Sequence, residues 1–311
     1  MYEKISKKIF RKYIIQCFIF GIIWTTLFFI LMMIFDNLIV KGIILLLFFN
    51  LIKRIIKELI RKNFLPIFHN ELNPEKFKYV IFSNKNFAPH AQDQLLATLF
   101  SGDYQTAINI CTKALKTFPD NTEVKYAYMP YLAKAYFELQ DLEKLKIICD
   151  KYYESIENPK KDKVIENLNS LIQYYHSFCV GNFEYGISYC QKRETEISKR
   201  TSTRKINIAN NKFYYAITYY KLGNLEKAKQ YFEELIEFAP KINMANIAKR
   251  YLAAIESGDE KLLENPEILP DDDFEIYRIG RIHQNRRYRI VLYILLCILA
   301  ISLIIPDILT L

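Results

Sequence analysis

The residues that could bind a metal ion are few and lie in the middle of the chain. His176 and Cys179 are three residues apart, and Cys190 follows them. Imidazole nitrogen and thiolate sulfur are the ligands that zinc prefers, so these three residues could form part of a metal site. However, Cys111 and Cys149 occupy the same position as Cys190 in their own segments of the chain. A position that repeatedly holds a small apolar residue indicates core packing, so we expect no metal and no cofactor.

Sequence motifs for catalysis are missing. No Gly-rich phosphate loop follows a predicted strand, and the chain contains neither HExxH nor the Ser/His/Asp order of a hydrolase. The acidic runs Glu233–Glu234 and Asp271–Asp273 are typical of a solvated surface rather than of an acid/base pair. We therefore predict that the protein is not an enzyme.

The elements that carry these residues recur along the chain. The clearest is "KLGNLEKAKQYFEELIEFAP", residues 221–240, and residues 102–119 share its pattern of Gly, Ala, aromatic and Pro residues. The marker positions are Gly102, Gln140, Gly181 and Gly223, spaced by 38, 41 and 42 residues, with Gly258 in a fifth, partial copy. Gly at the marker favours the left-handed conformation that ends a helix. The following Pro119 and Pro240 stop a second helix.

Small residues within each copy predict how the two helices pack. Ala107, Ala216 and Ala228 allow two helices to approach closely, and the neighbouring aromatic side chains fill the space beside them. One such pair cannot bury its own apolar face, so several pairs must stack.

This pattern resembles the tetratricopeptide repeat family over about residues 88–265. The resemblance implies an all-α fold, a solenoid of stacked helical hairpins whose first helices line a concave groove. It also implies a set of groove-facing residues: Leu96, Phe100, Lys134, Phe137, Tyr175, Phe178, Phe213, Ile217, Tyr220 and Lys221. An aromatic and aliphatic lining with a few lysines is typical of a surface that binds an amphipathic helix or an extended peptide. The alternative is that some of these aromatic side chains are buried against neighbouring repeats.

The two ends of the chain are apolar. Residues 14–35 contain 22 residues without a charge, enough to cross roughly 30 Å of hydrocarbon. Residues 38–52 are shorter and contain Lys41; we favour a second span over a helix that lies in the membrane surface. Residues 291–305 form a third predicted span. These flanking helices complete the predicted fold class.

Charge is divided unevenly between the ends and the middle. Residues 1–62 include 11 basic and 3 acidic residues, and residues 278–311 include 5 basic residues and 1 acidic residue. The middle, 63–277, has 27 basic and 30 acidic residues, which argues against a basic face for nucleic acid. Basic residues beside a span lie on the cytoplasmic side, so we expect residues 63–287 to be cytoplasmic.

These observations define five predicted regions: a membrane hairpin at 1–62, a connector at 63–87 that caps the solenoid, the repeats at 88–265, a juxtamembrane linker at 266–287 and a transmembrane helix at 288–311. The predicted function is a multi-pass cell-membrane protein whose cytoplasmic repeats recruit or scaffold a protein or peptide partner. The alternative is an accessory or regulatory subunit of a membrane transport or secretion complex.

Overall fold

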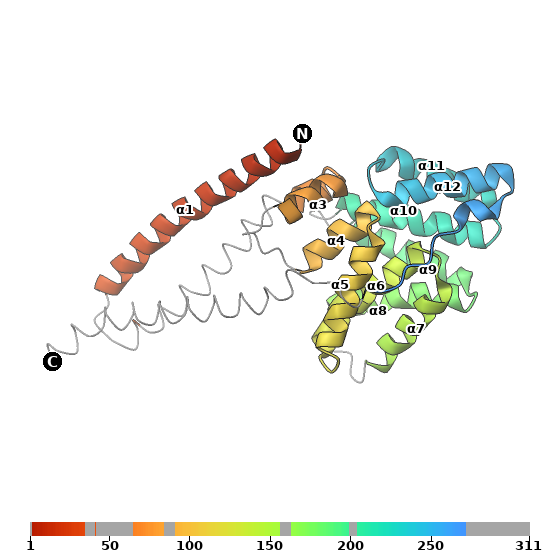
Figure 1. Ribbon diagram of the computed structural model, residues 1–311, viewed down its shortest axis with the longest axis horizontal. Coiled ribbons are helices and arrows are strands. Elements are labelled where there is room, and N and C mark those ends of the chain that lie inside the picture. The colour runs from red at the N-terminus through yellow and green to blue at the C-terminus, as the bar shows by residue number, and fades with distance from the viewer. Residues whose placement is uncertain are drawn as a thin grey trace. The chain divides into compact units, whose positions relative to one another are not determined.

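The computed structural model describes residues 2–34, 41, 65–83, 91–155, 163–198 and 204–271. The chain divides into two compact units. One comprises Met1–Pro66 and Tyr277–Leu311, and the other comprises Ile67–Ile276 (Figure 1). The predicted spans at 38–52, apart from Lys41, and at 291–305 lie outside the described residues.

Among its described residues the first unit contains the long helix α1 (Tyr2–Ile34), which includes residues 14–34 of the predicted span at 14–35. A stretch of 24 residues within it, Lys7–Ile30, has a mean hydropathy of 2.1. By length and composition this stretch is able to cross a membrane, a property that membrane-spanning helices share with N-terminal signal sequences.

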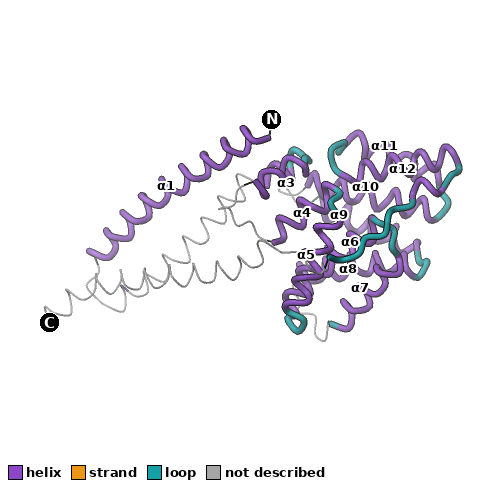
Figure 2. Tube along the Cα trace, viewed as in Figure 1, coloured by secondary structure: helices purple, strands orange, loops and turns teal. Residues whose placement is uncertain are grey.

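The second unit is built from helices, and its described residues contain no strand (Figure 2). The helices of this unit are α3 (Pro74–Ser83), α4 (Ala91–Ser101), α5 (Tyr104–Thr117), α6 (Thr122–Glu138), α7 (Leu142–Glu154), α8 (Lys163–Cys179), α9 (Phe183–Ile197), α10 (Arg204–Lys221), α11 (Leu225–Phe238), α12 (Asn243–Ser257) and the 3-10 helix η1 (Glu260–Leu263). Consecutive helices from α4 to α11 pack as four hairpins, and α12 packs on α11. This confirms an all-helical repeat architecture.

Every hairpin turns at a marker residue in the left-handed conformation. The φ angles are +83° at Gly102, +60° at Gln140, +72° at Gly181, +74° at Gly223 and +71° at Gly258. The residue after each marker is Asp or Asn, and its side chain accepts a hydrogen bond from a backbone N–H in the first turn of the next helix. The predicted role of the marker is therefore confirmed, with Gln140 adopting the same conformation without the freedom of glycine.

The small residues of the pattern lie where helices meet. Ala107, Ala216 and Ala228 are at most 1% exposed. The three cysteines at the shared position, Cys111, Cys149 and Cys190, are also buried, and burial raises the pKa of each thiol. This confirms that the cysteines serve as small core residues.

The connector packs on the first hairpin. Asn73 accepts a hydrogen bond from the backbone N–H of Lys76 and so caps α3. The Phe68 ring lies 4.9 Å from the Phe100 ring, and Lys78 forms an ion pair with Asp103 at 2.7 Å. The connector therefore covers the apolar end of the stack.

The last helix returns to the first hairpin. α12 contacts both its neighbour α11 and the distant α4. Asn243 at the start of α12 donates a hydrogen bond of 2.7 Å to the Tyr104 hydroxyl, and its side chain lies directly against Gly102. The stack therefore closes on itself within one unit, a feature that the repeat pattern alone did not predict.

Two glycine substitutions test separately the turn within a hairpin and the contact of α12 with the first hairpin. Gly223→Ala should lower the free energy of unfolding by about 1 kcal/mol, because φ is positive but the space around a new Cβ is open. Gly102→Ala should lower it by about 2–4 kcal/mol, because the Cβ would also lie 2.7 Å from the Asn243 Cγ. Urea unfolding followed by circular dichroism measures both, and equal losses would contradict a tight contact between α12 and the first hairpin.

Candidate functional site

The ten residues of the predicted groove lie on the first helices of the four hairpins. Leu96 and Phe100 are on α4, Lys134 and Phe137 on α6, Tyr175 and Phe178 on α8, and Phe213, Ile217, Tyr220 and Lys221 on α10. Of these helices, α4 contacts α6 and α6 contacts α8, and five of the ten residues, from α6, α8 and α10, line one cavity.

Most of these side chains are covered. Phe100, Lys134, Phe137, Tyr175, Phe178, Phe213 and Ile217 are at most 6% exposed. Leu96 and Tyr220 are half-buried, and Lys221 is exposed. The alternative considered from the sequence, burial of aromatic side chains between repeats, therefore holds for most of the set.

The cover over these side chains is provided partly by α12. The Met244 Sδ lies 3.8 Å from the Lys134 Nζ, and the Tyr251 ring lies 4.8 Å from the Tyr220 ring. The tight turn of the stack brings α12 into this position. The number of residues per repeat does not reveal how far successive hairpins rotate, so sequence reasoning could not detect this closure.

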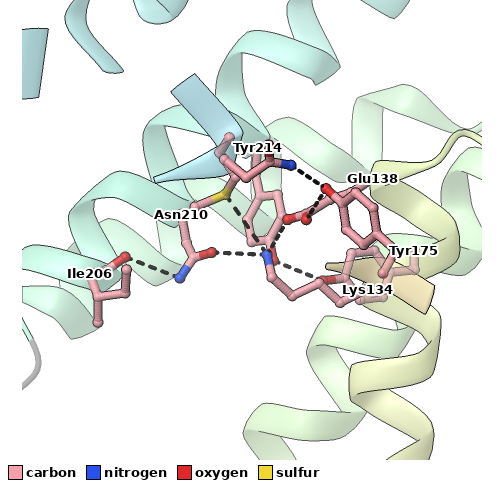
Figure 3. Close-up of polar contacts among 9 residues, drawn as sticks. Lys134, Glu138, Tyr175, Ile206, Asn210 and Tyr214 are labelled. Carbon is pink, nitrogen blue, oxygen red and sulfur yellow. Dashed lines mark hydrogen bonds and ion pairs between the residues drawn. The ribbon is translucent and has the colours of Figure 1, made fainter. Parts of the chain in front are cut away.

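A buried ion pair lies at the centre of the covered face (Figure 3). The Lys134 Nζ is 2.6 Å from the Glu138 Oε1, and the two side chains are 7% and 1% exposed. The ammonium also donates to the Asn210 Oδ1 at 3.2 Å, and it lies 4.8 Å from the centre of the Phe100 ring. The Tyr104 hydroxyl donates to the Glu138 Oε2 at 2.9 Å. These contacts link α4, α5, α6 and α10 through one charged pair.

The ion pair keeps the lysine charged. Burial alone would lower the pKa of Lys134, but the charge and hydrogen bond of Glu138, together with Tyr214, more than offset this effect, so the pKa lies above its ordinary value. Burial, reinforced by the Glu138 charge, raises the pKa of the Tyr104 hydroxyl, which therefore remains a proton donor to the carboxylate.

Sequence reasoning missed most members of this network. Lys134 was identified, but Glu138, Tyr104, Asn210 and Asn243 were not. The available signal was the spacing of Lys134 and Glu138 by one helical turn inside the apolar sequence LAKAYFE. The contributions of Tyr104, Asn210 and Asn243 depend on contacts between distant repeats, which no local pattern reveals.

Aromatic rings surround the pair. The Phe137 ring lies 5.7 Å from Tyr174, 4.9 Å from Tyr175, 5.1 Å from Phe178 and 6.1 Å from Tyr214. The Tyr175 and Tyr214 hydroxyls are 2.8 Å apart and form a hydrogen bond. Large rings at these separations pack edge to face or tilted, which adds to the stabilisation from area burial.

Part of the predicted groove remains open. A cavity of about 40 Å³, which we term the α10 pocket, is lined by five of the ten residues: Phe137, Phe178, Phe213, Ile217 and Lys221. Its other walls include Leu142 of α7 and Ile247 and Tyr251 of α12. A second opening of about 450 Å³, which we term the mouth, shares Gln140 and Lys221 with the pocket and includes Tyr220, Glu260 and Glu264.

The segment after α12 forms one wall of the mouth and continues across the repeats. We term residues 258–271 the C-terminal strap, drawn mainly as loop in Figure 2. Asn265 donates to the Leu139 carbonyl at 3.0 Å, and Gln140 donates to the Leu263 carbonyl at 3.2 Å.

Further along, the strap reaches α7 and then α5. Lys144 pairs with Glu267 at 2.9 Å, Gln105 donates to the Leu269 carbonyl at 2.8 Å, and the Asp271 N–H donates to the Asn109 Oδ1 at 2.8 Å. Residues 266–271 thus pack on the repeats, whereas the sequence placed them in a juxtamembrane linker.

The candidate metal ligands are not brought together. The His176 Nε2 lies 3.5 Å from the Asp150 Oδ1, while the Cys179 thiol donates to the Tyr175 carbonyl, and Cys190 is buried in the core. Within the part of the chain that the structure describes, no group of three His, Cys, Asp or Glu side chains could hold a metal ion.

Two stretches of the chain match models described as tetratricopeptide repeat. The first covers residues 100–144, which contain α5 and α6, and the second covers residues 209–242, which contain most of α10 and all of α11. The matches support a tetratricopeptide repeat protein, a class whose repeats form protein-interaction modules rather than catalytic sites. No curated protein and no solved structure was found to match the chain.

A double-substitution cycle tests the ion pair. Lys134→Met or Glu138→Leu alone should lower the free energy of unfolding by about 3–5 kcal/mol, because each leaves an uncompensated buried charge. The double variant should be less destabilised than either single variant, because it leaves neither charge behind. Urea unfolding of the four proteins measures the coupling, and additive losses would contradict a direct interaction.

Proposed function

We propose that the protein is a membrane-anchored interaction module whose cytoplasmic repeats bind a partner protein and so recruit or scaffold it at the cell membrane. The observation that carries the proposal is the α10 pocket, where five of the predicted groove residues line an opening on the first helices of the repeats. The two tetratricopeptide repeat matches support a protein partner.

The chemistry of the opening suggests what it binds. Phe137, Phe178, Phe213 and Ile217 offer an apolar floor to a single aliphatic or aromatic side chain of a partner peptide. The mouth combines Lys221 with Glu260 and Glu264, so an acidic group of a partner would find little net electrostatic attraction there. We therefore assign recognition to an apolar anchor, presented by an amphipathic helix or an extended segment.

Two features support anchoring at a membrane. α1 is long and apolar enough to cross one, and anchoring raises the local concentration of a bound partner at the bilayer. Within the repeat unit, the entering and leaving chain both contact the first hairpin. Lys78 pairs with Asp103, and the Asp271 N–H bonds to Asn109. Such an arrangement suits a module whose two ends continue into the same bilayer.

Two matched leucines test the pocket. Leu142 lines the α10 pocket and is 40% exposed, whereas Leu222 does not line it and is 38% exposed. Leu142→Glu should reduce partner recovery at least about tenfold, because a charge at the rim opposes an apolar anchor. Leu222→Glu should leave recovery unchanged. Crosslinking and mass spectrometry from native membranes measure both, and equal recovery from the two variants would remove the pocket as the binding site.

Reporter fusions test the predicted topology. A reporter inserted between residues 155 and 165 should be cytoplasmic, and one fused after Leu311 should be external, because basic residues precede the third predicted span. Labelling by membrane-impermeant reagents distinguishes the two sides. The reverse pattern would overturn the cytoplasmic assignment and, with it, the class of partner.

A further inference from the structure

A second pocket, distinct from the proposed groove, lies between α8, α9 and α10. Its lining includes Asn167 and Ser170 of α8, Lys192 and Arg193 of α9, and Asn207 of α10. None of its lining residues lines the α10 pocket or the mouth. Its cavity volume is about 80 Å³. A single water needs roughly 10–15 Å³ by such a measure, so the space suffices for a polyatomic group.

Arg193 is held rigidly at this pocket. Its NH1 donates to the Tyr189 hydroxyl at 2.9 Å, and its Cζ lies 5.8 Å from the Tyr189 ring centre and 5.7 Å from that of Tyr214. The Arg193 Nε is buried and has no hydrogen-bond acceptor among the described residues. A guanidinium presents several donors in a fixed plane, so this one retains donor capacity that the fold leaves unused.

The interior beside the pocket holds more positive than negative charge. The Tyr214 ring lies 5.7 Å from the Arg193 Cζ and also 5.7 Å from the Lys134 Nζ. Glu138 pairs with Lys134, but no carboxylate of the described residues forms an ion pair with Arg193. The Arg193 side chain is half-buried, but its buried Nε has no acceptor among the described residues, so this arrangement favours an anion next to Arg193.

The lining favours a single negative charge of planar shape. Lys192 and Arg193 bring two positive charges, but Lys192 pairs with Glu166 of α8 at 3.9 Å, and Glu196 also lines the pocket. A planar carboxylate matches the guanidinium fork, whereas Glu166 and Glu196 would repel the greater negative charge of a phosphate monoester. α8 and α10 also begin near the pocket, and their N-terminal ends are positive.

We propose that the pocket between α8, α9 and α10 binds a carboxylate group of a ligand, with Arg193 as its charged anchor and Asn167 as a neighbouring donor. The carboxylate belongs either to a small organic acid or to an acidic side chain of a peptide. This proposed site does not depend on the α10 pocket, so evidence against one of the two binding proposals does not count against the other.

The test is ligand-dependent thermal stability of the full-length protein. The probes are sodium glutamate, sodium acetate and a short glutamate-containing peptide blocked at both ends, with sodium chloride and inorganic phosphate at equal ionic strength for comparison. The carboxylates should raise the unfolding midpoint saturably and at lower concentration than phosphate does. Tighter binding of the peptide than of free glutamate assigns the carboxylate to a protein, and the reverse order assigns it to a small molecule.

Two isosteric substitutions on α8 provide the matched comparison. Asn167→Asp places a negative charge in the pocket and should raise the half-saturating carboxylate concentration at least about tenfold. Asn169→Asp makes the same charge change, but Asn169 accepts a hydrogen bond from Tyr152, a role that aspartate retains, so binding should not change. An equal response of the two variants, stabilisation by chloride alone, or preference for phosphate would overturn the proposal.

Discussion

The buried pair of Lys134 and Glu138 is the interaction on which the closed stack depends. It lies on α6, in the second hairpin, yet its partners come from the first, fourth and last helical units: Phe100 and Tyr104, Asn210, and Met244. Asn243 of α12 completes the set through its hydrogen bond to Tyr104. A charged pair removed from water needs partners for its remaining donors and acceptors, and here these partners come from helices far apart in the sequence. The pair thereby favours a specific closed geometry over the range of curvatures that stacked hairpins can adopt.

Closure of the stack determines how much of the concave face is accessible. In an open solenoid the first helices would expose their aromatic side chains, whereas here Phe137 and its neighbouring rings are buried and form a second core. What remains accessible is the α10 pocket and its mouth, between the first helices, α12 and the C-terminal strap. Any partner that uses this face meets a small apolar opening rather than a long channel, and recognition through one inserted side chain follows from that size.

The repeat pattern predicts the local structure well because the relevant physics is local. Gly102, Gly181 and Gly223 mark turns since a left-handed residue must end each first helix, and Ala107 or Ala228 marks a contact since only a small side chain fits there. The ten residues of the predicted groove lie on the first helices of the four hairpins, and their role in binding stays a prediction. Seven of the ten side chains are covered, as the alternative left open by the sequence allowed. The sequence could not tell which ones, because the covering residues lie far away in sequence, in α12 and in the facing repeats.

The sequence by itself determined the helical hairpins, their turns, their core positions and the apolar character of the N-terminal helix, because each of these depends on residues within a turn or two of one another. Only the tertiary structure decided the rest: that α12 returns to α4, that Glu138 and Tyr104 complete the environment of Lys134, and that Arg193 lies beside Tyr214 with no carboxylate of the described residues paired to it. These features arise from the rotation between successive hairpins. Small differences in side-chain packing change each rotation slightly, and these changes add up over the whole stack. A repeat motif constrains each hairpin but not this sum, and for that reason the closure of the stack is visible only in the tertiary structure.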